Sequence, residues 1–340
     1  MNTLLIQTQI EGHGGIPRFN RNLAHALTNA NEISLNDERP QGYEKSKFRF
    51  ILGLFNSILT KRPKIMIIGH LNFVPLSPFI KLISRSKIIV ILHGIEAWDK
   101  RKKLSVFYRF VDKYWSVSNF TALRFANANY IDQSKIKTIF NTLPEDWNIQ
   151  KGKYNPFFLS VTRLDASEGY KGIIESIHVV AAIQELMRSK GFQYVIVAHG
   201  NDVHSHQTLV QELGIQDLVT FKSNLGDHEL QTLYEECSFF VLPSTGEGFG
   251  IVFLEAMACA KPCIGAKNTG AEDVIVHGKT GYLVDQKPEQ MLPYFENLIL
   301  NKNVCEQLGE AGQQRLKDHF VFEHFEKRIH QLLEELDSGN

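Results

Sequence analysis

Two glutamates in one short stretch are placed for ligand chemistry. Glu247 lies in a turn rich in Pro, Ser, Thr and Gly, and Glu255 lies in the apolar segment that follows. An apolar run over 238–242 precedes the turn, and 251–260 has helix length and composition, so the stretch predicts a strand, a loop and a helix. The glycines let the backbone approach a ligand, and the first helical N–H groups would face it. This corner therefore suits a phosphate-bearing ligand.

The two carboxylates allow two interpretations. Glu255 is on the second turn of an otherwise apolar helix, where burial is costly unless a polar group, such as a ligand hydroxyl, meets it. Alternatively, Glu247 is a loop carboxylate favoured by the helix dipole, and Glu255 reaches the surface along its methylene groups.

Two cations follow another expected strand, 157–161. Arg163 and Lys171 belong to the single loop after it. Fixed cations at a strand end would stabilise the negative charge that develops on a departing diphosphate. The alternative is an Arg and a Lys that lie on the surface without a ligand.

The first half of the chain offers two further candidates. Gly14 and Gly15 follow the expected strand 4–9 and could admit phosphate or sugar oxygens, although a plain tight turn explains them as well. His93 follows the strand 87–92 directly; a lone His is more often a structural residue, but this position is better placed for function than most.

Strands and helices alternate along the whole chain, which predicts an α/β protein with parallel sheets. A polar stretch over 141–155 divides it into domains 1–150 and 151–320. Two Rossmann-like, doubly wound sheets would face each other across a cleft, and the amphipathic segment 321–336 would return to the first domain. Other expected strands cover 64–68, 114–117, 135–140, 194–198, 219–221 and 262–266, and helices cover 18–29, 47–60, 102–112, 119–127, 172–189, 204–213, 227–236, 289–299 and 302–317.

Charge is distributed unevenly between the halves. Residues 1–150 hold 21 Lys and Arg against 11 Asp and Glu, a net charge of +10, and the remainder hold 16 and 26, a net charge of −10. The basic half predicts attraction to an anionic acceptor or membrane surface, although a solvated helix face is the alternative. Four cysteines without paired spacing predict a cytoplasmic protein, as do the absence of a signal-like start and the lack of a long apolar run. The basic half predicts that it is peripheral on the inner face of the membrane.

Together these residues resemble a family, the retaining glycosyltransferases of family 4, which have the GT-B fold. The resemblance rests on GGI near the start, LHG after the third strand, VTRLD with KG, PSTGEGFGIVFLEAMA, and GKTGYLV at 278–284. It implies that Glu247 contacts the donor sugar and Glu255 the ribose, and that Arg163 and Lys171 hold the diphosphate. It also implies donor contacts for Gly14, Gly15, Gly248, Phe249 and Gly250, and a place for His93 beside the reacting sugar.

The sequence departs from the family pattern at three places. Thr162 replaces a usual Gly before the Arg, Thr142 follows Asn141 where Asn-Gly is common, and Ala260 replaces a usual Gly before Lys-Pro. The last change is interpreted as a matter of packing. Thr162 could narrow the nucleotide end of the donor site. The departures therefore bear on which donor binds rather than on the reaction.

The resemblance implies a retaining, metal-independent transfer of a hexose from a UDP-sugar, or next a GDP-sugar, to a saccharide in surface polysaccharide or glycoconjugate synthesis. The acceptor would be anionic or lipid-linked. No cofactor and no nucleic-acid partner are expected; no Asp-x-Asp occurs, and His204 and His206 are interpreted as surface residues. The alternatives are a non-catalytic partner subunit and a nucleotide-sugar epimerase or phosphorylase on the same fold.

Overall fold

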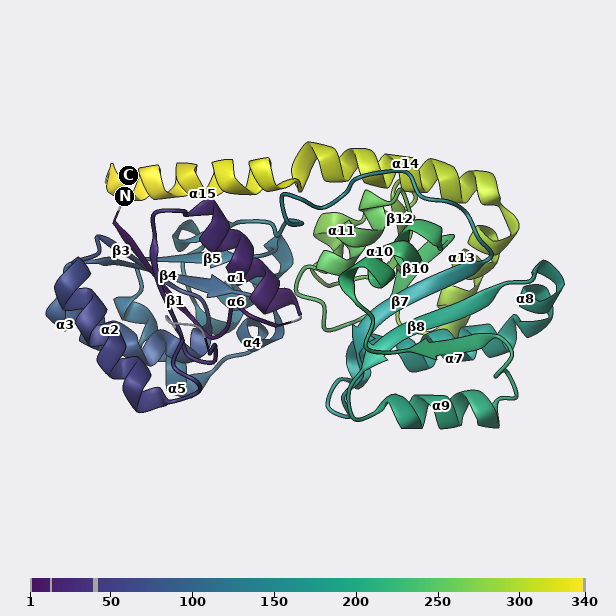
Figure 1. Cartoon of the computed structure of the whole chain (residues 1–340), viewed down its shortest axis with the longest axis horizontal. Helices are drawn as coiled ribbons and strands as arrows, with labels where there is room; N and C mark the ends of the chain where they lie inside the picture. The colour runs from purple at the N-terminus through teal and green to yellow at the C-terminus, as the bar shows by residue number, and fades with distance from the viewer. Residues whose placement is uncertain (1, 13, 39–41, 339–340) are drawn as a thin grey trace. The chain divides into compact units, whose positions relative to one another are not determined.

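The chain forms two compact units in a computed structural model that describes residues 2–12, 14–38 and 42–338. Unit 1 comprises Met1–Glu145 and Val321–Asn340, and unit 2 comprises Asp146–Phe320 (Figure 1). No helix in the described ranges has the length and apolar character needed to cross a membrane. Each unit is built around its own sheet.

Unit 1 contains a six-stranded parallel sheet with the order β2-β1-β3-β4-β5-β6. Its central strands are buried on both faces, as expected when helices cover a parallel sheet. The strand order reverses between β1 and β3, so the carboxyl ends of these strands border the usual ligand-binding position of such sheets. The strands are β1 (Thr3–Gln7), β2 (Asn31–Ser34), β3 (Ile65–Ile68), β4 (Lys87–Leu92), β5 (Lys113–Ser116) and β6 (Ile136–Thr138).

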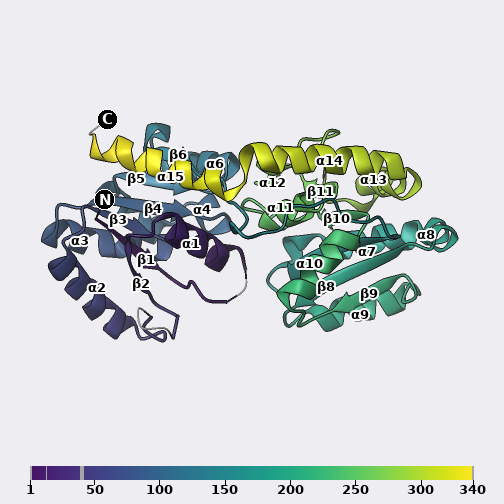
Figure 2. The same cartoon turned by 45° about the horizontal axis from the view of Figure 1, so that its top comes forward.

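The last helix of the chain, α15 (Phe322–Asp337), belongs to unit 1 and packs against α1 (Gly15–Ala26) (Figures 1 and 2). Phe325 contacts Phe19 edge to face, with 5.8 Å between ring centroids. The apolar stripe of α15 thus finds its surface within this unit. The other helices of unit 1 are α2 (Lys47–Lys61), η1 (Leu71–Leu76), α3 (Ser77–Ile83), α4 (Ile95–Trp98), α5 (Lys102–Ser105), η2 (Tyr108–Phe110), α6 (Asn119–Asn129) and η3 (Gln133–Lys135).

Unit 2 contains a second six-stranded parallel sheet, with the order β12-β11-β10-β7-β8-β9. Here the order reverses between β7 and β10, so the loops after these two strands lie side by side. The strands are β7 (Phe157–Arg163), β8 (Gln193–His199), β9 (Val219–Lys222), β10 (Phe239–Leu242), β11 (Cys263–Ala266) and β12 (Gly281–Val284). The predicted fold class, two doubly wound parallel sheets, is confirmed.

The helices of unit 2 alternate with its strands. They are η4 (Gly169–Lys171), α7 (Ile173–Ala182), α8 (Gln184–Lys190), α9 (Val203–Glu212), α10 (Asp227–Glu236), α11 (Ile251–Ala258), α12 (Ala271–Val274), α13 (Pro288–Leu300) and α14 (Lys302–His319). The four cysteines are buried and unpaired, as predicted.

Several predicted elements differ from the structure. The prediction of one helix over 102–112 is wrong, because this segment forms the short α5 followed by η2. Val, Phe and Tyr in its second half have weak helix propensity. The helix expected over 172–189 is two helices, α7 and α8, with the break at Ile183. Strands β2 and β12 were not predicted; β2 has only one apolar residue, Ile33, and so shows no apolar run.

Ala260 has a left-handed backbone conformation after the end of α11, with φ of 55°. The amide of Lys261 donates to the carbonyl of Ala256, the bond that closes a Schellman motif, in which glycine usually takes this position. The replacement of the usual Gly by Ala260 therefore affects the backbone conformation as well as the packing. A side chain there costs about 1 kcal/mol, because its Cβ crowds the following carbonyl.

We expect Ala260→Gly to raise the free energy of unfolding by about 0.5–1 kcal/mol, because glycine adopts this conformation without the Cβ clash. Urea unfolding followed by circular dichroism measures the change. The matched control is Ala311→Gly, at an exposed position within α14, which should lower stability by about 1 kcal/mol. Equal losses in both variants would show that Ala260 is not strained.

Candidate functional site

The predicted strand, loop and helix corner is present in unit 2 as β10, the loop 243–250 and α11. Gly250 precedes the first residue of α11 and has φ of 90°, which favours glycine. A Cβ on Gly250 would lie 2.3 Å from the ring of Phe253. This glycine is therefore required by the turn itself.

Glu255 is buried, and only 2% of the residue is exposed. The hydroxyl of Tyr234, on α10, donates to Glu255 Oε2 at 2.6 Å. The alternative in which Glu255 reaches the surface is therefore wrong. The protein itself supplies a polar partner to this carboxylate, which lowers the cost of burying it and fixes its orientation. Sequence analysis did not single out Tyr234.

Lys171 and Glu247 come together at the strand-order reversal. Lys171 lies in η4 after β7, Glu247 lies in the loop after β10, and Lys171 Nζ is 3.9 Å from Glu247 Oε2. Both side chains are mostly buried, with 18% and 16% exposed. Lys171 Nζ also lies 5.3 Å from the ring centre of Tyr170. The fold thus brings a predicted phosphate ligand beside the predicted sugar ligand.

Arg163, at the end of β7, is bound by two carboxylates. Its Nε donates to Glu168 Oε2 at 2.9 Å, Nη2 donates to Glu168 Oε1, and Asp165 Oδ2 lies 3.1 Å from Nε. The hydrogen bonds from Arg163 hold the pKa of Glu168 below its usual value, and the same bonds raise the pKa of Arg163. About half of the Arg163 side chain remains exposed, so it stays accessible.

Three hydrogen-bonding partners hold the loops of this edge together. The carbonyl of Tyr170 accepts from the amide of Thr245 and from Gln286 Nε2, each at 2.9 Å. Gly172 has φ of 75°, and a Cβ on it would lie 2.6 Å from the carbonyl oxygen of Pro243. The loops after β7, β10 and β12 therefore form one packed cluster.

The loop 243–250, which carries Gly246, Gly248 and Gly250, is closely packed. The amide of Gly270 donates to the carbonyl of Glu247 at 2.8 Å, and a Cβ on Gly270 would lie 2.0 Å from the carbonyl oxygen of Gly248. Phe249 is buried and contacts Phe320 edge to face. A donor would therefore contact the backbone at 248–250 rather than the Phe249 ring.

His93 occupies the carboxyl end of β4 in unit 1. Its Nε2 lies 2.8 Å from the carbonyl oxygen of Gly69, which can only accept, so Nε2 carries the proton and Nδ1 is the basic nitrogen. Burial lowers the pKa of His93, and the nearby Glu96 carboxylate opposes this only in part. The ring is 5.1 Å from Phe19 and 6.3 Å from His70, measured between centroids. A neutral imidazole is therefore held in place at neutral pH.

Gly14 and Gly15 differ in their structural roles. Gly14 precedes α1 with φ of 114°, so a turn accounts for this glycine. A Cβ on Gly15 would meet nothing within 4 Å. Packing within the chain therefore does not require glycine at position 15, which leaves room there for a ligand.

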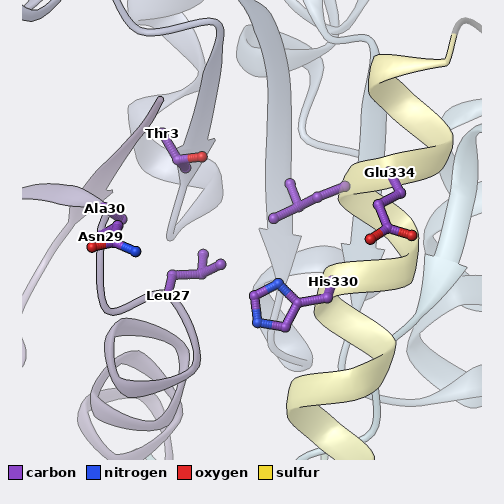
Figure 3. Close-up of a pocket in the computed structure, with 7 residues that line it drawn as sticks. Thr3, Leu27, Asn29, Ala30, His330 and Glu334 are labelled. Atoms are coloured by element: carbon purple, nitrogen blue, oxygen red, sulfur yellow. The ribbon is translucent and has the colours of Figure 1, made fainter. Parts of the chain in front are cut away.

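A small pocket of about 180 Å³ lies elsewhere in unit 1, between the start of β1 and α15 (Figure 3). His330 and Glu334 project from α15, and Thr3 lies at the amino end of β1. Because ligands of such sheets bind at the carboxyl ends, this pocket is not the candidate site. Among the described residues, no three His, Cys, Asp or Glu side chains group as metal ligands, and His206 is buried rather than on the surface as predicted.

Known proteins similar to this chain share both its sequence pattern and its fold. Over 229 residues it is 26% identical to the α-1,3/1,6-mannosyltransferase ALG2 of Dictyostelium discoideum, covering 62% of this chain and 54% of that one. Over 228 residues it is 25% identical to the capsular polysaccharide biosynthesis glycosyltransferase CapM of Staphylococcus aureus, covering 63% and 56%. The alignments thus span about half the length of these relatives.

Two solved structures match nearly the whole chain. The sucrose-phosphate synthase of Thermosynechococcus elongatus matches with a TM-score of 0.80 and 17% identity over all of both chains. Anabaena HepE, solved in complex with UDP and glucose, matches with a TM-score of 0.77 and 15% identity, over 98% of this chain and 100% of that one. At such identities the matches establish the fold, which is GT-B.

The match to a family model covers most of unit 2 and includes every loop described at its candidate site. The family described as glycosyl transferases group 1 matches residues 142–315. This span is just over half of the chain, so the resemblance inferred from the motifs is confirmed at the level of the family. The protein belongs to the group 1 glycosyl transferases.

Proposed function

We propose that this protein transfers a hexose from a nucleoside diphosphate sugar to a saccharide acceptor. The observation that carries the proposal is the convergence of Arg163, Lys171 and Glu247 at the strand-order reversal of unit 2. The two cations are complementary to a diphosphate, and the Glu247 carboxylate beside Lys171 is complementary to a sugar hydroxyl. The names of the mannosyltransferase and capsular polysaccharide relatives support surface polysaccharide or glycoconjugate synthesis as the setting.

The diphosphate would bind to Arg163 and Lys171. A diphosphate oxygen arriving near Lys171 Nζ would compete with Glu247, whose carboxylate is 3.9 Å from that nitrogen and holds it weakly. Arg163 keeps its planar group in one orientation through Glu168, so little side-chain entropy is lost when a phosphate binds. The site is thus preorganised for negative charge that grows as the sugar leaves.

The sugar and the nucleoside would occupy opposite ends of this cation pair. Glu247 would accept hydrogen bonds from hydroxyls of the hexose, freed from Lys171 once the diphosphate takes that cation. Glu255, oriented by Tyr234, would contact the ribose hydroxyls. We favour UDP as the nucleotide and GDP next; the relatives of this chain include a GDP-mannose-dependent mannosyltransferase of Mycobacterium tuberculosis, whose name supports GDP.

The acceptor would bind to unit 1 at the carboxyl ends of β1 and β4, near Gly15 and His93. For transfer with retention, the acceptor oxygen would attack the anomeric carbon on the face from which the diphosphate leaves. The carbon–phosphate oxygen bond breaks, the new glycosidic bond forms, and the leaving oxygen takes the acceptor proton. No protein nucleophile, cofactor or metal is needed, because Arg163 and Lys171 supply the positive charge.

We further propose that the acceptor is anionic or linked to lipid. The net charge of +10 over residues 1–150 favours such an acceptor on electrostatic grounds. It also favours a chain that works in the cytoplasm at the inner face of the membrane. An electrostatic preference of this kind acts mainly on the rate of encounter and weakens as salt is added.

We expect calorimetric titration to find that one of UDP, GDP and ADP binds, and that Arg163→Ala weakens it roughly tenfold to hundredfold, because charged hydrogen bonds are lost. The matched control is Arg188→Ala, since Arg188 pairs with Asp217 on the same unit away from the site. Binding of none of the three diphosphates would favour a partner-binding subunit instead. Equal effects of the two variants would remove Arg163 from the site.

We expect the free energy of unfolding of unit 1 to fall as the pH drops below about 6.5. In the unfolded state a histidine takes up a proton in this pH range. In the folded state burial lowers the pKa of both His93 and His70, so the unfolded state binds more protons. Replacing both by Gln should flatten the slope measured by urea unfolding. His330→Gln, at an exposed position on α15, is the control. A steep slope that survives the double replacement would contradict this account.

We expect the product to keep the anomeric configuration of the donor and activity to persist in EDTA, because two side-chain cations neutralise the diphosphate. Nuclear magnetic resonance of the new anomeric proton measures the configuration. An inverted product, or activity that EDTA abolishes and Mg²⁺ restores, would exclude this mechanism. Formation of a sugar 1-phosphate from a glycoside and inorganic phosphate would indicate a phosphorylase, and isomerisation of the donor sugar without an acceptor would indicate an epimerase.

A further inference from the structure

The first unit contains a long segment without any acidic residue. From Lys45 to Ile95 the sequence carries nine Lys and Arg residues and no Asp or Glu, although the whole chain holds 37 of each kind. This segment includes α2 and α3. All of these cations except Lys87, at the start of β4, lie on these two helices or in the turns beside them.

Helix α2 has two apolar faces. Phe50, Leu54 and Ile58 are buried in the core of unit 1. A second stripe, Phe48, Leu52 and Leu59, follows helical spacing on another face, and 74%, 53% and 62% of these residues are exposed. Burial in the core explains the first stripe only, and the second is largely exposed in the described part of the chain.

Helix α3 carries exposed apolar residues of its own. Ile80 packs into the core cluster that α2 also joins, while Phe79 and Leu82 are 58% and 83% exposed. The two helices lie on the same side of unit 1 in both views (Figures 1 and 2). Large apolar side chains this exposed, on neighbouring helices, are typical of an interaction surface.

The cations around these apolar residues are largely available. Lys47, Lys61 and Arg62 flank the two ends of α2, and none of them has a carboxylate partner among the described side chains. Lys81 is the exception on α3, since it binds Asp112 at 2.6 Å. A partner with both negative charge and an apolar layer would meet both parts of the surface.

We propose that the α2–α3 face docks on an anionic lipid bilayer, where "α2–α3 face" denotes Phe48, Leu52, Leu59, Phe79 and Leu82 with Lys47, Lys61 and Arg62. Helix α2 would lie in the plane of the interface, with its outer stripe among the acyl chains and its cations at the headgroups. A second copy of this chain docked through the same face would bring its own positive segment and be repelled. This proposal rests on the proposed function, because the face would bring the protein to the membrane that holds a lipid-linked acceptor. Binding to lipid can nevertheless be measured without a sugar donor.

Co-sedimentation of the full chain with vesicles tests this proposal. We expect binding to vesicles of phosphatidylcholine with phosphatidylglycerol, little binding to phosphatidylcholine alone, and loss of binding in high salt. Replacing Lys47, Lys61 and Arg62 by Gln should weaken binding on the order of a hundredfold, because each cation near an anionic surface raises the affinity about fivefold. Replacing Phe48, Leu52 and Leu59 by Gln should also weaken it about tenfold or more.

Two controls separate the outcomes. Leu123→Gln, at an exposed leucine of α6 in the same unit, should bind vesicles like the wild type. Nucleoside diphosphate binding by all variants shows whether they are folded, and it tests the proposed function separately. Failure of the wild type to bind anionic vesicles would overturn the inference. So would equal binding by all variants, or a self-association in sedimentation velocity that the Phe48, Leu52 and Leu59 replacements abolish while vesicle binding persists.

Discussion

The strand order of the second sheet is the constraint on which the candidate site depends. Because β10 pairs with β7, the loops that leave these strands begin side by side at one edge. The carbonyl of Tyr170 then joins them by accepting from Thr245 and Gln286. Arg163 and Glu247, which are far apart in sequence, therefore share one edge of the sheet.

The two cations at this edge differ in how tightly carboxylates hold them. Arg163 is held by two carboxylates and stays half-exposed, whereas Lys171 is mostly buried beside one carboxylate at 3.9 Å. The first cation is fixed in direction, and the second is loosely paired and can exchange its partner. An arriving diphosphate would thus replace a weak ion pair rather than a strong one, so less interaction energy is lost on binding.

Much of the fold and some of the site followed from the sequence. The βα alternation, the corner at Glu247 and the cations after β7 were visible as local patterns of residue type. Glu168 could have been found as a carboxylate five residues after Arg163, but its bidentate contact depends on the turn in which the amide of Glu168 donates to the carbonyl of Asp165. Tyr234 and Gln286 reach the site from elements distant in the chain, so no local pattern indicates them. Helix breaks at Ser105 and Ile183 were missed because the apolar spacing continues through them.

A crystal structure with the bound nucleoside diphosphate would test the central claim most directly, since that claim places the diphosphate on the edge between β7 and β10. The account predicts phosphate oxygens within hydrogen-bonding distance of Lys171 Nζ and of the Arg163 guanidinium, with the Lys171–Glu247 contact opened. A diphosphate bound at another edge of the sheet, or one that leaves both cations with their present carboxylates, would contradict it.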